Sequence, residues 1–216
     1  MESYVIVDLE MCNVPRASRG NGVHLKNEVI QIGAVRLNED LEVCDSFMSY
    51  VKPEFGVIDE LIENLTGITE DDVRDAPYFE QAMVDFLSWL PRDAVLVSWS
   101  KSDEIQIRKE SGAKNLYFPK LNGLLEEWID CQRTFDDIMD TSMCYGLSDA
   151  LNISSIDYDH HIHDALVDAK NTALLFAKME RERDQGFTLS PYISIGNGDN
   201  LSYSPFADLL RVCNFA

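Results

Sequence analysis

Two acidic side chains interrupt the first apolar run of the chain, YVIVDLEMCN, residues 4–13. Asp8 and Glu10 are two positions apart, and residues two apart on a strand point to the same face of the sheet. Two carboxylates that close raise each other's pKa, and burial raises it further. A hard divalent cation removes that penalty because such ions bind oxygen ligands. Taken alone, the pair fits an acid pair at a solvated strand end better than it fits a metal site.

A third acid, Asp103, comes shortly after AVLVSW, residues 94–99, a fully apolar run that is typical of a buried strand. Open α/β sheets place their sites beyond the carboxyl ends of such strands. The alternative is that Asp103 is only an acid in the first turn of a helix, where the helix dipole favours negative charge.

A histidine and a fourth acid open the late segment HDALVDAKNTA. His163 and Asp168 are five residues apart, so they are not stacked neighbours on one helix. We expect His163 in the preceding loop or the first turn and Asp168 one turn further in, on a closely packed face rich in alanine.

In this order, the elements resemble the motifs of the DEDDh 3′–5′ exonucleases. The three motifs read VDLEMCN, SWSKSDEIQI and HDALVDAKNTA. The usual third motif of that family, His-x-Ala-x-x-Asp-Ala, is matched position by position by His163, Ala165, Asp168 and Ala169. The segment ENLTGIT, residues 63–69, also looks like the stretch before the family's central helix. The resemblance covers residues 3–180 and is closest in look to the histone-messenger and interfering-RNA exonucleases.

The resemblance implies a role for each polar residue. Asp8 would bridge two divalent cations, Mg²⁺ or Mn²⁺. Glu10 and Asp168 would complete the first cation site, and Asp103 would hold the second cation directly or through water. His163 would be the general base for the attacking water, since an unperturbed imidazole pKa of about 6.5 suits proton uptake at neutral pH. The product implied is a 5′-nucleoside monophosphate.

Three further residues correspond to places where this family contacts the terminal nucleotide. Met11 follows the first two acids, where the family often presents an apolar wedge or a backbone contact. Leu65 and Thr66 occupy the segment that often stacks against the last base. The alternative for all three is core packing and helix termination.

The elements that must position these residues follow from hydrophobic periodicity. We expect three strands in an antiparallel meander and, later, two more strands: 4–9, 28–37, 43–53, 94–99 and 126–131. We expect helices where apolar residues recur with a helical period, the first of them ended by Gly67: 56–69, 76–90, 100–112, 145–153 and 163–184. Strands followed by alternating helices and strands predict an α/β fold. With the resemblance, the expectation is a ribonuclease H-like fold, a mixed central sheet of about five strands flanked by helices.

Charge and composition narrow the class of protein. The chain has 216 residues, with 38 acidic and 18 basic side chains and a net charge of −20. Such a protein repels polyanions at long range, so nucleic-acid binding must be local, metal-assisted or restricted to short strands. We see no signal peptide and no apolar run near the ~20 residues of a membrane span. Five scattered cysteines without a Cys-x-x-Cys pair indicate a reduced, cytoplasmic protein that does not bind membranes.

We therefore expect an exonuclease domain over residues 1–183 and a C-terminal extension, 184–216, that packs on the domain or is partly flexible. The substrate expected is the 3′ end of single-stranded nucleic acid, with RNA favoured over DNA. One alternative is a proofreading-type DNA exonuclease docked to a polymerase, for which the acidic surface would serve as a protein-binding surface. The other is a catalytically inactive exonuclease fold used as a binding module, although all five polar residues are present.

Overall fold

The computed structural model describes residues 3–19, 25–140, 144–189, 194–195 and 201–202. Its central sheet has five strands in the spatial order β3-β2-β1-β4-β5. The strands are β1 Ser3–Asn13, β2 Asn27–Leu37, β3 Val43–Tyr50, β4 Ala94–Ser98 and β5 Ile129–Asp130. β1, β2 and β3 pair antiparallel, whereas β4 pairs parallel with β1 and with β5. The expected α/β fold with a mixed sheet of five strands is confirmed.

Eight α-helices and one short 3₁₀ helix are present in the described part of the chain. The 3₁₀ helix η1 is Arg16–Arg19. The α-helices are α1 Glu60–Thr66, α2 Glu70–Val73, α3 Phe79–Trp89, α4 Ser102–Ala113, α5 Pro119–Glu126, α6 Cys131–Ile138, α7 Leu147–Ile153 and α8 Ala165–Glu182. A separate antiparallel pair joins β6, Ser194–Ile195, to β7, Leu201–Ser202.

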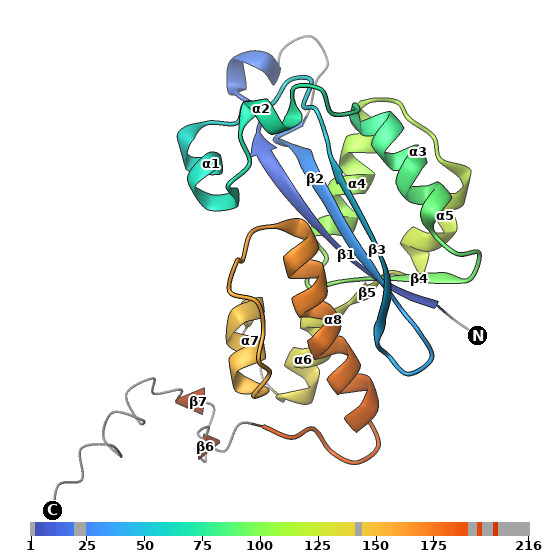
Figure 1. Ribbon diagram of the computed structural model, residues 1–216, viewed down its shortest axis with the longest axis vertical. Coiled ribbons are helices and arrows are strands. Elements are labelled where there is room, and N and C mark those ends of the chain that lie inside the picture. Colours follow the sequence, from blue (N-terminus) through green and yellow to red (C-terminus); the bar gives the residue numbers. More distant parts are fainter. Residues whose placement is uncertain (1–2, 20–24, 141–143, 190–193, 196–200, 203–216) are drawn as a thin grey trace, which may run out of the picture.

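The sheet is covered by helices on both faces (Figure 1). One apolar cluster joins the strands to α3, α4 and α5, and a second joins them to α6, α7 and α8. Successive side chains of a strand point to opposite faces of the sheet, so the side chains of β1 alternate between these two clusters. Val5, Val7 and Leu9 belong to the first cluster and Ile6 to the second. Asp8 and Glu10 therefore continue the row begun by Ile6, on the face covered by α8.

The C-terminal end of α1 agrees with the expectation from the sequence. α1 ends where Gly67 adopts a left-handed conformation, with a φ of 71°, and its N–H bonds back to the carbonyl of Glu63. Glycine carries no Cβ penalty in that conformation, which explains its place after the helix.

Among the described residues, no helix has both the length and the apolar character needed to cross a membrane. The proposed extension, 184–216, lies largely outside the described residues.

Candidate active site

The first two acids lie inside a central strand and not at its end. β1 continues to Asn13 and pairs with β2 over that length, whereas its pairing with β4 ends at Ile6. The side chain of Glu10 is buried, and that of Asp8 is partly exposed. Asp8 lies opposite Gly33 and Glu10 opposite Gln31 in the pairing with β2. The solvated strand end that the sequence alone favoured is therefore wrong, because the sequence pattern ended the strand too early.

Asp103 is attached directly to the strand that carries these acids. It stands in the first turn of α4, and its side chain is only 4% exposed. Its Oδ1 accepts a hydrogen bond from the backbone N–H of Leu9 over 3.1 Å, and its Oδ2 accepts one from Ser102 Oγ over 3.2 Å. Because Leu9 separates Asp8 from Glu10, the third carboxylate is held beside the first two. Asp103 is thus both an acid in the first turn of a helix and a neighbour of the acids on β1, so the two interpretations of the sequence do not exclude each other.

The start of α8 supplies the fourth acid and the histidine. Asp168 is buried in the first turn of α8, and its Oδ2 accepts a hydrogen bond from the backbone N–H of His163 over 2.9 Å. His163 precedes the helix in a left-handed conformation, with a φ of 69°. Non-glycine residues with such a φ are uncommon and concentrate at functional sites. The other carboxylate oxygen, Asp168 Oδ1, is buried and has no hydrogen-bond partner among the described residues.

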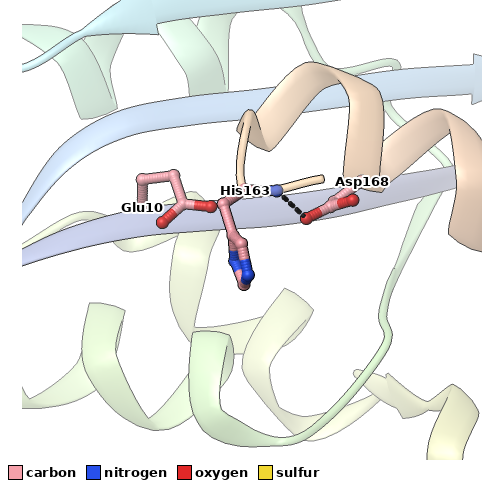
Figure 2. Close-up of side chains that lie close together, drawn as sticks. All are labelled: Glu10, His163 and Asp168. Carbon is pink, nitrogen blue, oxygen red and sulfur yellow. Dashed lines mark hydrogen bonds between the residues drawn. The ribbon is translucent and has the colours of Figure 1, made fainter. Parts of the chain in front are cut away.

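These elements bring three side chains to one point. One atom each of Glu10, His163 and Asp168 lies within 4.8 Å of the others, although the residues come from β1, from the loop before α8 and from α8 (Figure 2). Two carboxylates and an imidazole at this spacing are a donor set for a divalent cation.

The acids of this site act on one another electrostatically. Burial raises the pKa of Asp8 well above its usual range, and the charges of Asp103, Asp168 and Glu10 raise it further. Burial, followed by the charges of Asp168 and Asp103, raises the pKa of Glu10 to about 8. All four carboxylates therefore lie in one electrostatic cluster.

The buried position of Asp103 likewise raises its pKa to about 7, although hydrogen bonds from Ser102 and Leu9 act in the opposite direction. Burial also raises the pKa of Asp168. Several carboxylates that resist ionisation together are stabilised in their charged form by a divalent cation, which supplies the missing positive charge. The orphaned oxygen of Asp168 and the all-oxygen composition of the four acids fit Mg²⁺ or Mn²⁺.

The three residues expected to contact a nucleotide have different surroundings. Leu65 is 47% exposed and is free to contact a ligand. The hydroxyl of Thr66 donates to the carbonyl of Ile62 and accepts from the N–H of Ile68, so it takes part in ending α1. Met11 follows a register shift in β1 and packs against the apolar cluster on the α3 side of the sheet. Their roles toward substrate stay predictions.

Two polar residues beside the acids were missed by sequence reasoning. Gln31 is fully buried in β2 and bonds to Asp164, the residue between His163 and α8. The signal available was an amide inside the otherwise apolar run EVIQIGAV, residues 28–35, and an aspartate at the N-cap position of a helical pattern.

A comparison with known families decides the class of protein. The family model described as Exonuclease matches residues 5–176, most of the chain. The chain belongs to the exonuclease family. Curated relatives of this chain include a PolC-type DNA polymerase III from Caldanaerobacter subterraneus subsp. tengcongensis, 30% identical over 176 residues, 82% of this chain and 11% of that protein. They also include the 3′–5′ exoribonuclease 1 of Mus musculus, 28% identical over 188 residues, 81% of this chain and 52% of that protein.

Solved structures show the same fold. The nuclease domain of 3′hExo, a DEDDh family member bound to rAMP, superposes with a TM-score of 0.72 at 24% identity, covering 88% of this exonuclease and 96% of that chain. Cell-death related nuclease 4 superposes with a TM-score of 0.70 at 19% identity, covering 98% and 77%. The expected likeness to exonucleases is confirmed by the family model, and the expected fold is confirmed by its superposition on the DEDDh family member. The chain spans about a tenth of the polymerases and about half of the exoribonucleases that it matches.

Proposed function

We propose that this exonuclease hydrolyses phosphodiester bonds from the 3′ end of single-stranded nucleic acid and releases 5′-nucleoside monophosphates. The observation that carries the proposal is the convergence of Glu10, His163 and Asp168 within 4.8 Å. Asp8 and Asp103 belong to the same electrostatic cluster. A site that concentrates four carboxylates and one imidazole suits a cation-dependent hydrolysis.

The acids are proposed to hold two divalent cations, Mg²⁺ or Mn²⁺. Asp8 would contact both cations, Glu10 and Asp168 one of them, and Asp103 the other. When bound, such ions generate a nucleophile from water at neutral pH and neutralise charge on the attacking and leaving oxygens. The protein's own contribution is to hold these side chains in place: the bond of Asp103 ties α4 to β1, and the bond of Asp168 ties the loop that carries His163 to α8.

His163 is proposed as the general base. Its backbone N–H bonds to Asp168, which fixes the loop, and its imidazole is partly exposed beside Glu10. A base at that place can accept a proton from the attacking water and pass it to solvent. General-base groups of this kind contribute about 10²–10⁴-fold to rates.

The substrate is proposed to be a single strand, with RNA preferred over DNA. The chain carries a net charge of −20, so a long duplex would be repelled before it reached the acids. A single 3′ end needs only local contacts, for which Leu65 offers exposed apolar surface, with Met11 and Thr66 as further candidates. The preference for RNA rests on the likeness to the exoribonucleases.

The proposal is tested with 5′-labelled single strands of RNA and of DNA that share one sequence. With Mg²⁺ or Mn²⁺, we expect a ladder that shortens from the 3′ end, faster on RNA, and no cleavage in excess chelator. A 3′-phosphate on the same strand should slow the first step. Internal cuts, or degradation that starts at the 5′ end, would contradict the proposal.

A second candidate is a proofreading exonuclease, because a relative at 30% identity is a PolC-type DNA polymerase III. Under this alternative, the acidic surface would bind a polymerase, and DNA would be digested at least as fast as RNA. The two functions are separated by comparing digestion rates on the matched RNA and DNA strands above. A DNA primer with a mismatched 3′ end is a third substrate for the same comparison. An inactive binding module would instead show no cleavage and no cation binding at millimolar concentration.

A further inference from the structure

A buried amide lies next to the acid cluster without being one of its proposed ligands. Gln31 is 0% exposed and occupies the position of β2 directly opposite Glu10. Residues directly opposite on paired strands share one face of the sheet, so Gln31 points toward α8 as Glu10 does. Burying an amide is costly unless its donor and acceptor are both satisfied.

Both ends of the Gln31 amide are used, and both bond to the start of α8. Its Oε1 accepts a hydrogen bond from the backbone N–H of Ala165 over 2.9 Å, and its Nε2 donates to Asp164 Oδ2 over 3.1 Å. The other oxygen, Asp164 Oδ1, caps the helix by accepting from the N–H groups of Leu166 and Val167, each over 3.0 Å. Because a backbone N–H can only donate, the orientation of the Gln31 amide is fixed.

In the same region, the backbone of α8 comes very close to the backbone of β2. A Cβ on Gly33 would lie 2.1 Å from the carbonyl carbon of Ala165, so only glycine allows α8 to rest on the backbone of β2 there. Gly33 is opposite Asp8, and Gln31 is opposite Glu10. Gly33 therefore sets how close the helix comes, and the bonds of Gln31 set how it is rotated and shifted along the strand.

The residues held by these bonds are the neighbours of the proposed base and ligand. Asp164 directly follows His163, and its carbonyl accepts the N–H of Asp168 over 2.9 Å. We infer that Gln31 and Asp164 are a positioning pair, which holds His163 and Asp168 against Glu10 and does not itself contact substrate. This inference rests on the proposed exonuclease function.

A polarity exchange tests the pair. Gln31→Glu keeps an acceptor for Ala165 and, assayed at a pH at which the new side chain is ionised, sets a carboxylate against Asp164. Asp164→Asn keeps the helix cap but sets two amide donors against each other. The double variant Gln31→Glu/Asp164→Asn restores one donor and one acceptor and leaves the net charge beside the acids unchanged. We expect each single variant to lower kcat by about 10–100-fold with little change in KM, as outer residues of metal sites do. The double variant should return to within about threefold of the original protein.

A matched control makes the same substitution in an exposed Gln–Asp pair that contacts none of the proposed site residues. Gln81 Nε2 donates to Asp85 Oδ1 over 2.8 Å on the exposed face of α3. Gln81→Glu should leave kcat unchanged. If the single variants at the positioning pair keep full kcat, or if the double variant is no better than the worse single variant, the inference is overturned.

A readout without catalysis separates this inference from the proposed function. Exchange of the Ala165 amide hydrogen, measured by NMR on the metal-free protein, should be faster in Gln31→Leu, which removes the acceptor of that N–H, than in the original protein or in the control Gln81→Leu. If the original protein has no exonuclease activity, the proposed function fails, yet the exchange pattern still tests the pair. Unchanged exchange in Gln31→Leu would contradict the bond between Ala165 and Gln31.

Discussion

The backbone N–H of Leu9 donates to the carboxylate of Asp103 over 3.1 Å, although the two residues are 94 positions apart. Leu9 lies between the two acids of β1, and its own side chain packs on the opposite face of the sheet. The bond thus uses the backbone of the acidic strand to place a third acid. β1 and α4 together hold three carboxylates in place, and the first turn of α8 supplies the fourth.

Asp103→Asn separates the structural role of this residue from its charge. The amide oxygen can still accept from Leu9, so we expect the fold and the melting temperature to be kept or slightly raised. The lost negative charge weakens cation binding, and metal sites supply several kcal/mol to such reactions. We therefore expect kcat/KM to fall by about 10²–10³-fold, since each 1.36 kcal/mol is tenfold. Thermal unfolding and digestion of a single strand measure both effects, and a variant with full activity would exclude Asp103 from the site.

The acid cluster should make the metal-free protein less stable as the pH rises. Burial and mutual repulsion raise the pKa of Glu10 to about 8 and that of Asp103 to about 7 in the folded protein. The folded state thus holds protons that the unfolded chain, with carboxyl pKa values of about 4, has already lost. This stability is fully present below about pH 4 and is lost as the pH rises through about 7 to 8.

Melting temperatures between pH 5 and pH 8.5 in chelator check this expectation. Saturating Mg²⁺ or Mn²⁺ should flatten the decline, because the cation favours the ionised acids, and Glu10→Gln should flatten it without metal. A metal-free protein whose stability rises steadily through this range would show that the acids are not clustered in solution.

Gly33→Ala should cost both stability and activity. The new Cβ would meet the carbonyl carbon of Ala165 at 2.1 Å, so α8 would have to move away from β2 and carry Asp168 with it. Overpacking of this kind costs about 1–3 kcal/mol or more. The control is Gly123→Ala in α5, where a Cβ meets no described atom within 4 Å and the helix should gain about 0.5–1 kcal/mol. Equal melting temperatures and activities for the two variants would rule out the close approach.

A buried ion cluster ties α4 to β2 away from the acids. The Nζ of Lys114 lies 2.9 Å from Glu28, 3.0 Å from Glu110 and 2.8 Å from Glu54. The side chains of Glu28 and Glu110 are completely buried. Lys114→Met leaves these two charges unpaired, so we expect a loss of about 3–5 kcal/mol in the free energy of unfolding.

The control for this variant is Arg133→Ala, which removes an exposed ion pair with Asp137. This pair has the same i,i+4 spacing as the buried pair of Lys114 and Glu110. Exposed pairs of this kind contribute about 0–1 kcal/mol. Denaturant unfolding measures both variants, and a similar small loss in each would mean that the Lys114 cluster is open to water.

The sequence predicted the five-stranded sheet and suggested five site residues, but it did not show which hydrogen bonds join them. Apolar runs place β2, β3 and β4 to within a few residues, whereas β1 continues to Asn13, past the end expected at residue 9. The runs of β2 and β4 are clearest because nearly all of their residues are buried. Three helices, α2, α5 and α6, were missed. α6 was hidden because Cys131 was assigned to the strand before it. Its cap was readable, since the Asp130 side chain accepts from the N–H of Arg133.

Periodicity also could not tell which apolar residues face the core. Val57, Ile58, Leu61, Ile62 and Leu65 share a helical period, yet only Ile58 and Ile62 are buried. Val57 precedes α1, and Leu61 is 68% exposed. The pattern measures hydrophobicity, whereas burial depends on what packs against the helix. For the same reason, the bonds from Gln31 to α8 depend on a tertiary contact that no local pattern records.

The central claim is that Asp8, Glu10, Asp103 and Asp168, with His163, act as one cation-dependent hydrolytic site. The most direct test is release of nucleotide from a 3′-labelled single strand by the original protein and by Asp8→Ala, both at saturating Mg²⁺ and both shown to be folded by thermal unfolding. We expect the original protein to release mononucleotides and to stop in chelator, and Asp8→Ala to be slower by at least about 10²-fold. Equal rates for the two folded proteins would contradict the claim.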